Sequence, residues 1–207
     1  IIVEGAVTDD DLRRLLLRHT PAIVHISGHG ADGGTDGGIK FEDEHGMAHI
    51  ISAGALADLF QLCQEHVNCV VLNACYSENV ADAIRQYIPY VVGMSDNIGD
   101  DASLKFAIGF YDALAHGRTF EEAFQFGRNA IDLKNIPESL VPVLKKKPDA
   151  HSQPLFSAAE KQVCPEPSDL RPLLQSALRT DADFDGFCLD YFPHVYRRFA
   201  AGQDRVA

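Results

Sequence analysis

Two short runs of mainly apolar, β-branched residues constrain this chain most, because each ends at a residue with catalytic chemistry. The first run, residues 22–26, stops at the loop Ser27-Gly28-His29-Gly30. The second run, residues 69–73, stops at Ala74-Cys75. Apolar runs of this length are typical of strands that are buried on both faces of a parallel sheet. Ligands bind beyond the carboxyl ends of such strands, so the sequence predicts an imidazole and a thiol at one edge of a sheet.

A thiol and an imidazole in this arrangement are the parts of a cysteine nucleophile and its general base. A free thiol is mostly protonated at neutral pH, and a nearby imidazole takes up its proton and later passes it to a leaving amine. We therefore predict that Cys75 is the nucleophile and His29 the base. The backbone N–H groups of Gly30 and Cys75 are the expected oxyanion donors, next to a helix predicted from Glu78. The alternative is a small core cysteine and a hydrogen-bonded loop histidine.

The rest of the first 135 residues alternates between strand and helix patterns. Strands are predicted at 1–4, 22–27, 39–43, 48–51, 69–73 and 90–94, and helices between Thr8 and Pro21 and at 53–65, 78–86, 100–116 and 120–133. The expected N-caps are Thr8, Ser52, Asp100 or Asp101, and Thr119 with Glu122 in a capping box. Leu104, Ile108, Tyr111 and Leu114 have the spacing of a buried helix face. This order predicts an α/β fold with a mostly parallel sheet and helices on its faces.

The composition of the sequence changes after residue 133. Residues 136–167 hold six prolines and the basic run Lys145-Lys146-Lys147, so we interpret them as a linker or wrapping segment. Helical patterns with many aromatic residues return at 168–207. The expected organisation is therefore a domain over 1–135, a linker over 136–167 and a small helical segment over 168–207.

Charge and cysteine content exclude several classes of protein. The net charge of −12 argues against a nucleic-acid binder, which would carry a basic face. The sequence contains no apolar run long enough for a membrane span. Five cysteines, an odd number without CxxC pairs, indicate a reducing, cytoplasmic protein. Because its first residues already read as a core strand, we expect the chain to begin inside a domain.

Three patterns imitate metal or phosphate sites, and we predict no cofactor and no metal from them. His25 and His29 are four apart, but a zinc pair at this spacing needs a helix. The glycines of 28–38 lack the Gly-Lys-Ser/Thr of a phosphate loop. The calcium-loop pattern that begins at Asp181 has Phe192 where a glutamate is needed.

The motifs around the two candidate residues resemble those of a known family. His-Ile-Ser-Gly-His-Gly at 25–30 and Leu-Asn-Ala-Cys-Tyr-Ser at 72–77 are similar to the histidine and cysteine motifs of caspase-like proteases, most closely the prokaryotic CHAT family. The segments 92–94, 106–117 and 121–123 agree in order, so the resemblance covers roughly 1–135. It implies a three-layer α/β/α caspase-hemoglobinase fold and peptide-bond hydrolysis by Cys75 and His29. The family usually has a strand and helix before Ile1, so the sheet either lacks an element or takes it from a separate chain.

The resemblance also bears on substrate selection. In arginine- and lysine-directed relatives the residue two before the cysteine is usually an aspartate, whereas here it is Asn73, which carries no charge. Ser95 and Asp96, in the loop after the strand at 90–94, are further candidates for substrate contact. The alternative for Asp96 is a turn-forming aspartate.

Partners are implied by resemblance alone. The segment from Phe187 to Phe199 is similar to the beginning of a prokaryotic death-like, effector-associated adaptor domain, which implies recruitment through like-with-like helices. The alternative is a helical cap on the protease core. Some CHAT proteases act in bacterial defence on proteins encoded nearby, so the expected partner is a protein substrate, such as a gasdermin-like or other effector. The competing hypothesis for the whole chain is a catalytically silent caspase-like scaffold.

Overall fold

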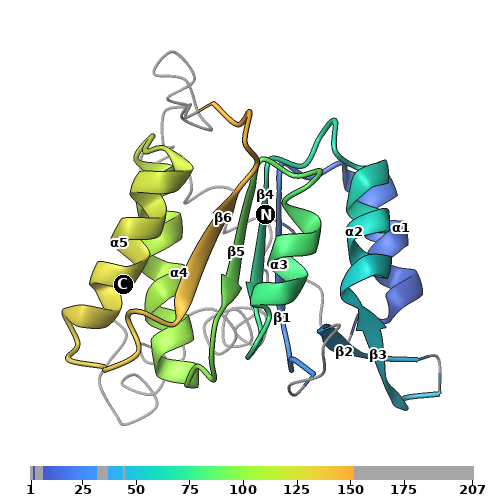
Figure 1. Ribbon diagram of the computed structural model, residues 1–207, viewed down its shortest axis with the longest axis horizontal. Coiled ribbons are helices and arrows are strands. Elements are labelled where there is room, and N and C mark those ends of the chain that lie inside the picture. The colour runs from blue at the N-terminus through green and yellow to red at the C-terminus, as the bar shows by residue number, and fades with distance from the viewer. Residues whose placement is uncertain (1, 3–6, 32–36, 44, 152–207) are drawn as a thin grey trace, which may run out of the picture. The chain divides into compact units, whose positions relative to one another are not determined.

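The computed structural model describes residues 2, 7–31, 37–43 and 45–151 of the chain (Figure 1). The chain separates into two units, residues 1–158 and 159–207, and all described residues belong to the first. The predicted strand at 1–4, except Ile2, the adaptor-like segment at 168–207 and the pattern that begins at Asp181 lie outside the described residues.

A four-stranded sheet forms the centre of the described unit. Its order is β1 (Ile23–Ser27), β4 (Cys69–Asn73), β5 (Tyr90–Met94) and β6 (Pro142–Lys146). β1 pairs with β4 and β4 with β5 in parallel, whereas β5 and β6 are antiparallel. The expectation of a mostly parallel sheet is therefore confirmed. Among the described strands, β1 has β4 as its one neighbour and lies at the edge of the sheet.

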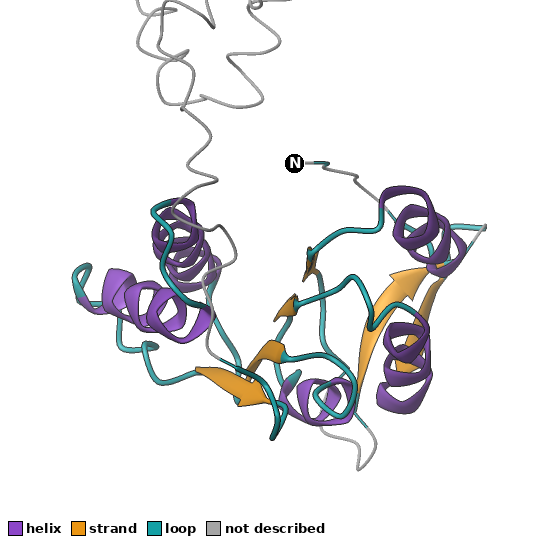
Figure 2. Ribbon diagram, turned by 90° about the horizontal axis from the view of Figure 1, so that it is seen from above, coloured by secondary structure: helices purple, strands orange, loops and turns teal. Residues whose placement is uncertain are grey.

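Helices cover both faces of this sheet, as the three-layer expectation requires (Figure 2). On one face lie α4 (Asp100–Ala115) and α5 (Phe120–Asp132). On the other lie α1 (Asp9–His19), α2 (Ala53–Leu62) and α3 (Glu78–Ile84), beside the antiparallel hairpin of β2 (Gly38–Glu42) and β3 (Ala48–Ser52). The alternation of side chains along each strand creates the two cores. Val70 and Leu72 of β4 face α1–α3, whereas Cys69 and Val71 face α4 and α5.

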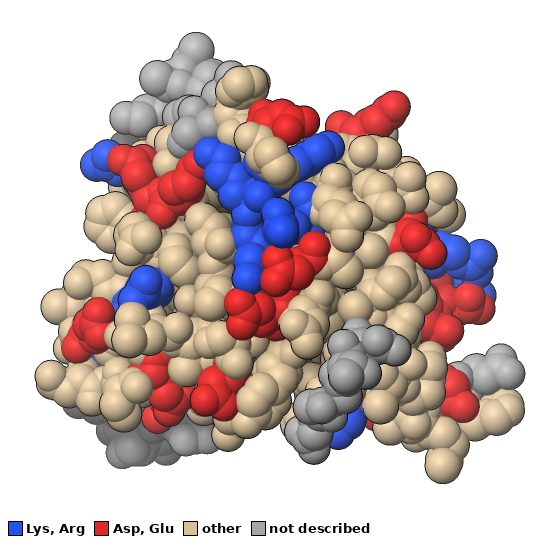
Figure 3. All heavy atoms as spheres, in the orientation of Figure 1, with Lys and Arg blue, Asp and Glu red and all other residues tan. Residues whose placement is uncertain are grey.

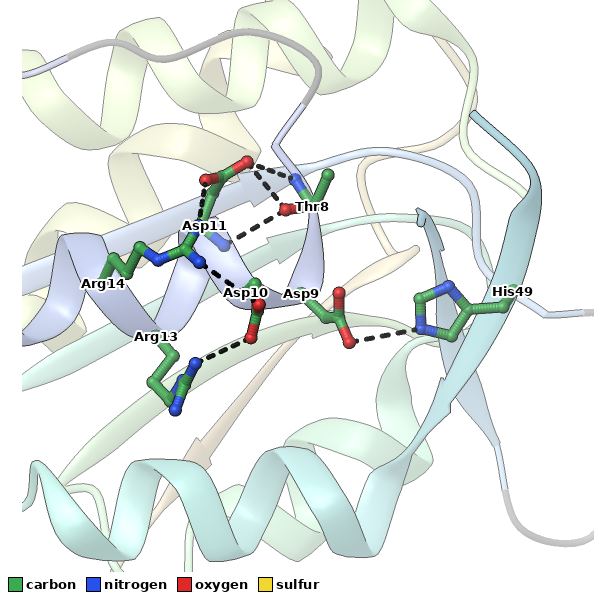
Figure 4. Close-up of polar contacts among 7 residues, drawn as sticks. All are labelled: Thr8, Asp9, Asp10, Asp11, Arg13, Arg14 and His49. Atoms are coloured by element: carbon green, nitrogen blue, oxygen red, sulfur yellow. Dashed lines mark hydrogen bonds and ion pairs between the residues drawn. The ribbon is translucent and has the colours of Figure 1, made fainter. Parts of the chain in front are cut away.

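Three of the helices begin at the N-cap residues that were predicted from the sequence. Thr8 caps α1, and its side chain and the Asp11 carboxylate complete a capping box (Figure 4). Hydrogen bonds from Thr8 hold the pKa of Asp11 below its usual range. Ser52 caps α2 and Thr119 caps α5, the latter in the expected box with Glu122. The predicted N-cap of α4, Asp100 or Asp101, was wrong. The N-cap is Gly99, whose N–H donates to the Glu138 carboxylate at 2.6 Å.

The buried face of α4 also differs from the prediction. Leu104 and Ile108 are 53% and 47% exposed, whereas Phe106 and Phe110 are fully buried. Leu114 is buried as expected and Tyr111 is half-buried. The helix carries two apolar stripes with equally helical spacing, and α5 packs against the one that contains the phenylalanines.

The linker interpretation of 136–167 was wrong for residues 142–146, which form β6. Every residue of β6 pairs with β5, from Tyr90 opposite Lys146 to Met94 opposite Pro142. Pro142 is tolerated because it is the first residue of β6, which lies at the edge of the sheet among the described strands. Lys145 binds the carboxylates of Glu78 and Asp82 at 2.7 and 3.0 Å, which ties β6 to α3. Positive side chains gather with acidic ones below them on the face shown in Figure 3.

No helix in the described part of the chain is long and apolar enough to cross a membrane.

Candidate active site

The register of the sheet brings the two candidate loops to the same level. Ser27 at the end of β1 lies opposite Asn73 at the end of β4. The ladder continues one step further, because the Gly28 N–H donates to the Asn73 carbonyl at 3.2 Å. The chain segments that lead to His29 and Cys75 therefore leave the sheet side by side.

The loops touch through Gly30 and Cys75. A Cβ placed on Gly30 would lie 1.7 Å from the Cys75 carbonyl oxygen and 2.8 Å from its carbonyl carbon. No side chain fits at such a distance, so glycine is required by the close approach of the two main chains. The predicted convergence of the histidine and cysteine loops is confirmed at the level of the main chain.

The β2–β3 hairpin supports the histidine loop from its other side. The Lys40 N–H of β2 donates to the His29 carbonyl at 2.9 Å, and the Ala31 N–H donates to the Gly38 carbonyl at 3.0 Å. His29 itself is exposed. Among the hydrogen bonds of the described residues, none joins the His29 imidazole to the Cys75 thiol.

The Cys75 thiol instead faces the loop that follows β5. Its Sγ lies 2.8 Å from Asn97 Oδ1 and 3.8 Å from the Ile98 carbonyl oxygen. Cys75 is half-buried and packs at the margin of the core beneath α4 and α5. Asn97 was not predicted from the sequence, although its neighbours Ser95 and Asp96 were candidates. A polar residue in the next loop along the sheet edge was the signal that could have found it.

A buried serine and a left-handed residue shape the turn that carries Cys75. The Ser77 hydroxyl donates to the Leu72 carbonyl at 3.1 Å and accepts the Met94 N–H at 3.0 Å, so it joins the ends of β4 and β5. Tyr76 has φ of 57°, and its N–H donates to the Asp96 carbonyl at 3.3 Å. A bulky residue in this region is strained, and such strain is common at functional turns.

Within the described part of the chain, the predicted oxyanion donors have no hydrogen-bond acceptor. Among the hydrogen bonds of the described residues, neither the Gly30 N–H nor the Cys75 N–H acts as a donor. Both groups belong to the pair of residues at which the loops touch. The assignment of the oxyanion hole stays a prediction.

The three candidate substrate residues occupy different environments. Asn73 is half-buried, and its Oδ1 is buried without a hydrogen-bond partner in the described part of the chain. Ser95 donates through both its N–H and its hydroxyl to the Val141 carbonyl, which makes it an anchor of the loop. The Asp96 carboxylate accepts the N–H of the following residue, Asn97, at 2.7 Å, so it bonds within its own loop. Substrate contact by these residues stays a prediction.

His25 fastens β1 to α4. Its Nδ1 lies 3.0 Å from the Tyr111 hydroxyl, its Nε2 lies 3.2 Å from the Ser27 hydroxyl, and its ring stacks on Tyr111. Desolvation of the ring lowers the pKa of His25, although the residue as a whole is exposed at the sheet edge. Both ring nitrogens are thus occupied by protein hydroxyls, next to the strand end that leads to His29.

The described cysteines differ in accessibility. Cys63, Cys69 and Cys75 are all free thiols. Cys69 is completely buried in β4, and burial raises the pKa of its thiol far above the ordinary value. Burial also raises the pKa of the half-buried Cys63. Of the three, Cys75 is the thiol at the carboxyl edge of the sheet.

Comparisons with known proteins agree with this architecture. The chain is 28% identical over 142 residues to a "Roc-COR-CHAT protease" from an unknown prokaryotic organism, and the match covers 66% of this chain and 13% of that protein. It is 26% identical over 167 residues to a "Probable protease" of Gillisia limnaea, and this match covers 79% of the chain and 29% of the relative. The chain thus spans less than a third of the length of either relative. The family model of the CHAT domain matches residues 1–136, about two thirds of the sequence, so the chain belongs to the CHAT-domain family.

Proposed function

We propose that this chain is a cysteine endopeptidase in which Cys75 attacks the peptide carbonyl and His29 transfers the proton. The observation that carries the proposal is the contact between Gly30 and the Cys75 main chain, which sets the imidazole-bearing loop against the thiol-bearing turn. Two relatives with protease in their names support the reaction class.

The proposed reaction uses groups that lie beyond the carboxyl ends of β1 and β4. His29 accepts the proton of the Cys75 thiol, and the sulfur adds to the carbonyl carbon of the substrate. The N–H groups of Gly30 and Cys75 donate to the resulting oxyanion. The intermediate collapses to a thioester as protonated His29 gives its proton to the leaving amine. Water, deprotonated by His29, then hydrolyses the thioester and restores the thiol.

The test is cleavage of candidate protein substrates by the wild-type chain, Cys75→Ala and Cys63→Ala, with the cleaved bond located by mass spectrometry. We expect Cys75→Ala to abolish cleavage without changing the melting temperature. Cys63→Ala is the matched control, because it removes a half-buried thiol at the end of α2, away from the sheet edge. Equal cleavage by all three proteins would disprove the proposal.

The biological setting is part of the proposal. We place the enzyme in a bacterial defence or regulated cell-death system in the cytoplasm, where it cleaves a partner protein after an adaptor engages the 168–207 segment. The support is the family together with an odd number of cysteines that show no CxxC spacing in the sequence. Asn73, Ser95 and Asp96 are the proposed substrate contacts, and the neutral Asn73 argues against strict selection of basic residues. A peptide series varying only the residue before the scissile bond tests this.

A caspase-shaped binding scaffold is the second candidate, and one observation favours it. The Cys75 sulfur is hydrogen-bonded to Asn97, and no hydrogen bond joins it to His29 within the described residues. A scaffold would retain its full biological effect in a Cys75→Ser variant, whereas a protease would lose it.

A further inference from the structure

We propose that Asn97 is a positioning residue that holds the Cys75 thiol in a resting orientation, and that attack on substrate requires this amide to release the sulfur. The inference concerns the regulation of the proposed active site and rests on Cys75 being its nucleophile. We call the contact between Cys75 Sγ and Asn97 Oδ1 the Asn97 latch.

The position of the sulfur is the first observation. Sγ lies 2.8 Å from Asn97 Oδ1, with the Ile98 carbonyl oxygen 3.8 Å away. Both neighbours are acceptors, so the thiol proton is directed into the 95–99 loop. The histidine loop lies against the carbonyl of the same cysteine, yet the imidazole receives no hydrogen bond from the thiol among the described residues. The two loops are thus assembled while the thiol is bonded elsewhere.

The loop that carries Asn97 is fastened at both ends. Ser95 donates through its N–H and its hydroxyl to the Val141 carbonyl at 2.9 and 3.1 Å. The Gly99 N–H donates to Glu138 Oε2 at 2.6 Å. Between these anchors the Ile98 side chain is buried in the core beneath α4 and α5. The side chain of Asn97 is therefore presented to the sulfur by a fixed loop.

The contact favours the protonated form of the sulfur. An amide oxygen accepts a hydrogen bond from a thiol, but a thiolate has no proton to offer and is repelled by the same oxygen. Transfer of the proton to His29 therefore requires the loss of the Asn97 hydrogen bond. A substrate or activator that moves the 95–99 loop, or that turns the amide, releases the nucleophile.

The test is the rate at which iodoacetamide alkylates Cys75 in the full chain, followed at each cysteine by peptide mass spectrometry. Because one net hydrogen bond is lost, we expect Asn97→Ala to accelerate alkylation of Cys75 by about 3- to 10-fold. Asn97→Asp keeps an acceptor oxygen and adds a negative charge, so it should react no faster than wild type. Cys63, in the same molecule, is the internal reference, and its rate should not change.

Two outcomes would overturn the latch. One is an unchanged or slower reaction of Cys75 in Asn97→Ala, which would mean that the amide does not restrain the thiol. The other is equal acceleration in Asn97→Ala and Asn97→Asp, which would mean that the loop, and not the hydrogen bond, limits access. A purely structural role predicts this second pattern, so the opposite responses of the two variants are the diagnostic readout.

Failure of the latch and failure of the proposed function are distinguishable. Alkylation needs no substrate, so the latch can be verified even if neither the wild-type chain nor Cys75→Ala cleaves any protein. Conversely, cleavage that depends on Cys75, together with an unchanged alkylation rate in Asn97→Ala, would leave the endopeptidase standing and remove the latch.

Discussion

The α-carbon of Gly30 faces the carbonyl oxygen of Cys75 with no room for a methyl group between them. This contact joins two segments that are more than forty residues apart in the sequence. The geometry of the site therefore depends on Gly30 having no side chain, and a substitution at this position tests it.

We predict that Gly30→Ala lowers the melting temperature and abolishes cleavage, because its Cβ would displace the Cys75 main chain. Gly28→Ala is the matched control, since the nearest atom to its Cβ is the Lys40 carbonyl oxygen at 4.0 Å. The control should melt like wild type in differential scanning calorimetry. Equal melting temperatures for the two variants would show that the loops are not in contact.

The second prediction concerns His29 as the proposed general base. His29→Ala should lower kcat by about 100- to 10,000-fold, the usual contribution of a positioned acid or base, with KM little changed. His66→Ala, which removes an exposed imidazole in the turn after α2, should leave kcat unaffected. A His29→Ala enzyme with wild-type kcat would assign proton transfer to another group.

Ser77 provides the third prediction. Replacing it with alanine removes the hydroxyl that satisfies the Leu72 carbonyl and the Met94 N–H, both buried. The free energy of unfolding should fall by about 1–3 kcal/mol. Ser103→Ala removes an exposed hydroxyl bonded to the Asp100 carbonyl, and its effect should stay within about 0.5 kcal/mol. Urea unfolding at neutral pH measures both, and similar losses would contradict the bridging role of Ser77.

The fourth prediction is a pH dependence that originates at His25. Its folded pKa is lowered by desolvation below the ordinary value of 6.5, so between these two pKa values the unfolded chain binds more protons. Stability from this residue is therefore present above pH 6.5 and falls as the pH drops towards the folded pKa. The effect should be small because the residue is partly exposed.

The measurement compares melting temperatures at pH 7.5 and 5.5. His25→Gln should lose less stability on acidification than wild type, because it has no proton to take up at this site. His66→Gln should lose as much as wild type. If His25→Gln followed the wild-type curve, the Tyr111 and Ser27 contacts would not be desolvating the ring.

Much of the fold was predictable because its signals are local. The side chains of Thr8, Ser52 and Thr119 cap helices through residues three positions away, so sequence spacing alone identifies them. The α4 face was not predictable in this way, since Leu104 and Phe106 both belong to stripes with helical spacing. Packing against α5, which is not encoded in α4 itself, buries the stripe that contains Phe106.

The strand β6 was missed for a related reason. Prolines and a lysine run are typical of linkers, and only pairing with β5, fifty residues earlier, turns this segment into a strand. In the candidate site, too, some residues are identified by local sequence and others depend on distant contacts. Cys75 and His29 were predicted from their places after strands, and Gly30 from its motif, and their catalytic roles stay predictions. The place of Asn97 in the loop after β5 could have made it a candidate, but its contact with the sulfur depends on anchors at Glu138 and Val141, which lie far along the sequence.

The anchoring of the 95–99 loop at both ends has a consequence for where this chain can be divided. The family match stops at residue 136, yet Glu138, Val141 and β6 lie after it. A fragment that ended there would keep the thiol and the imidazole. It would lose the hydrogen-bond acceptors of Glu138 and Val141, which hold the loop that places Asn97 beside the sulfur. The smallest piece that preserves this contact geometry therefore extends at least to Lys146.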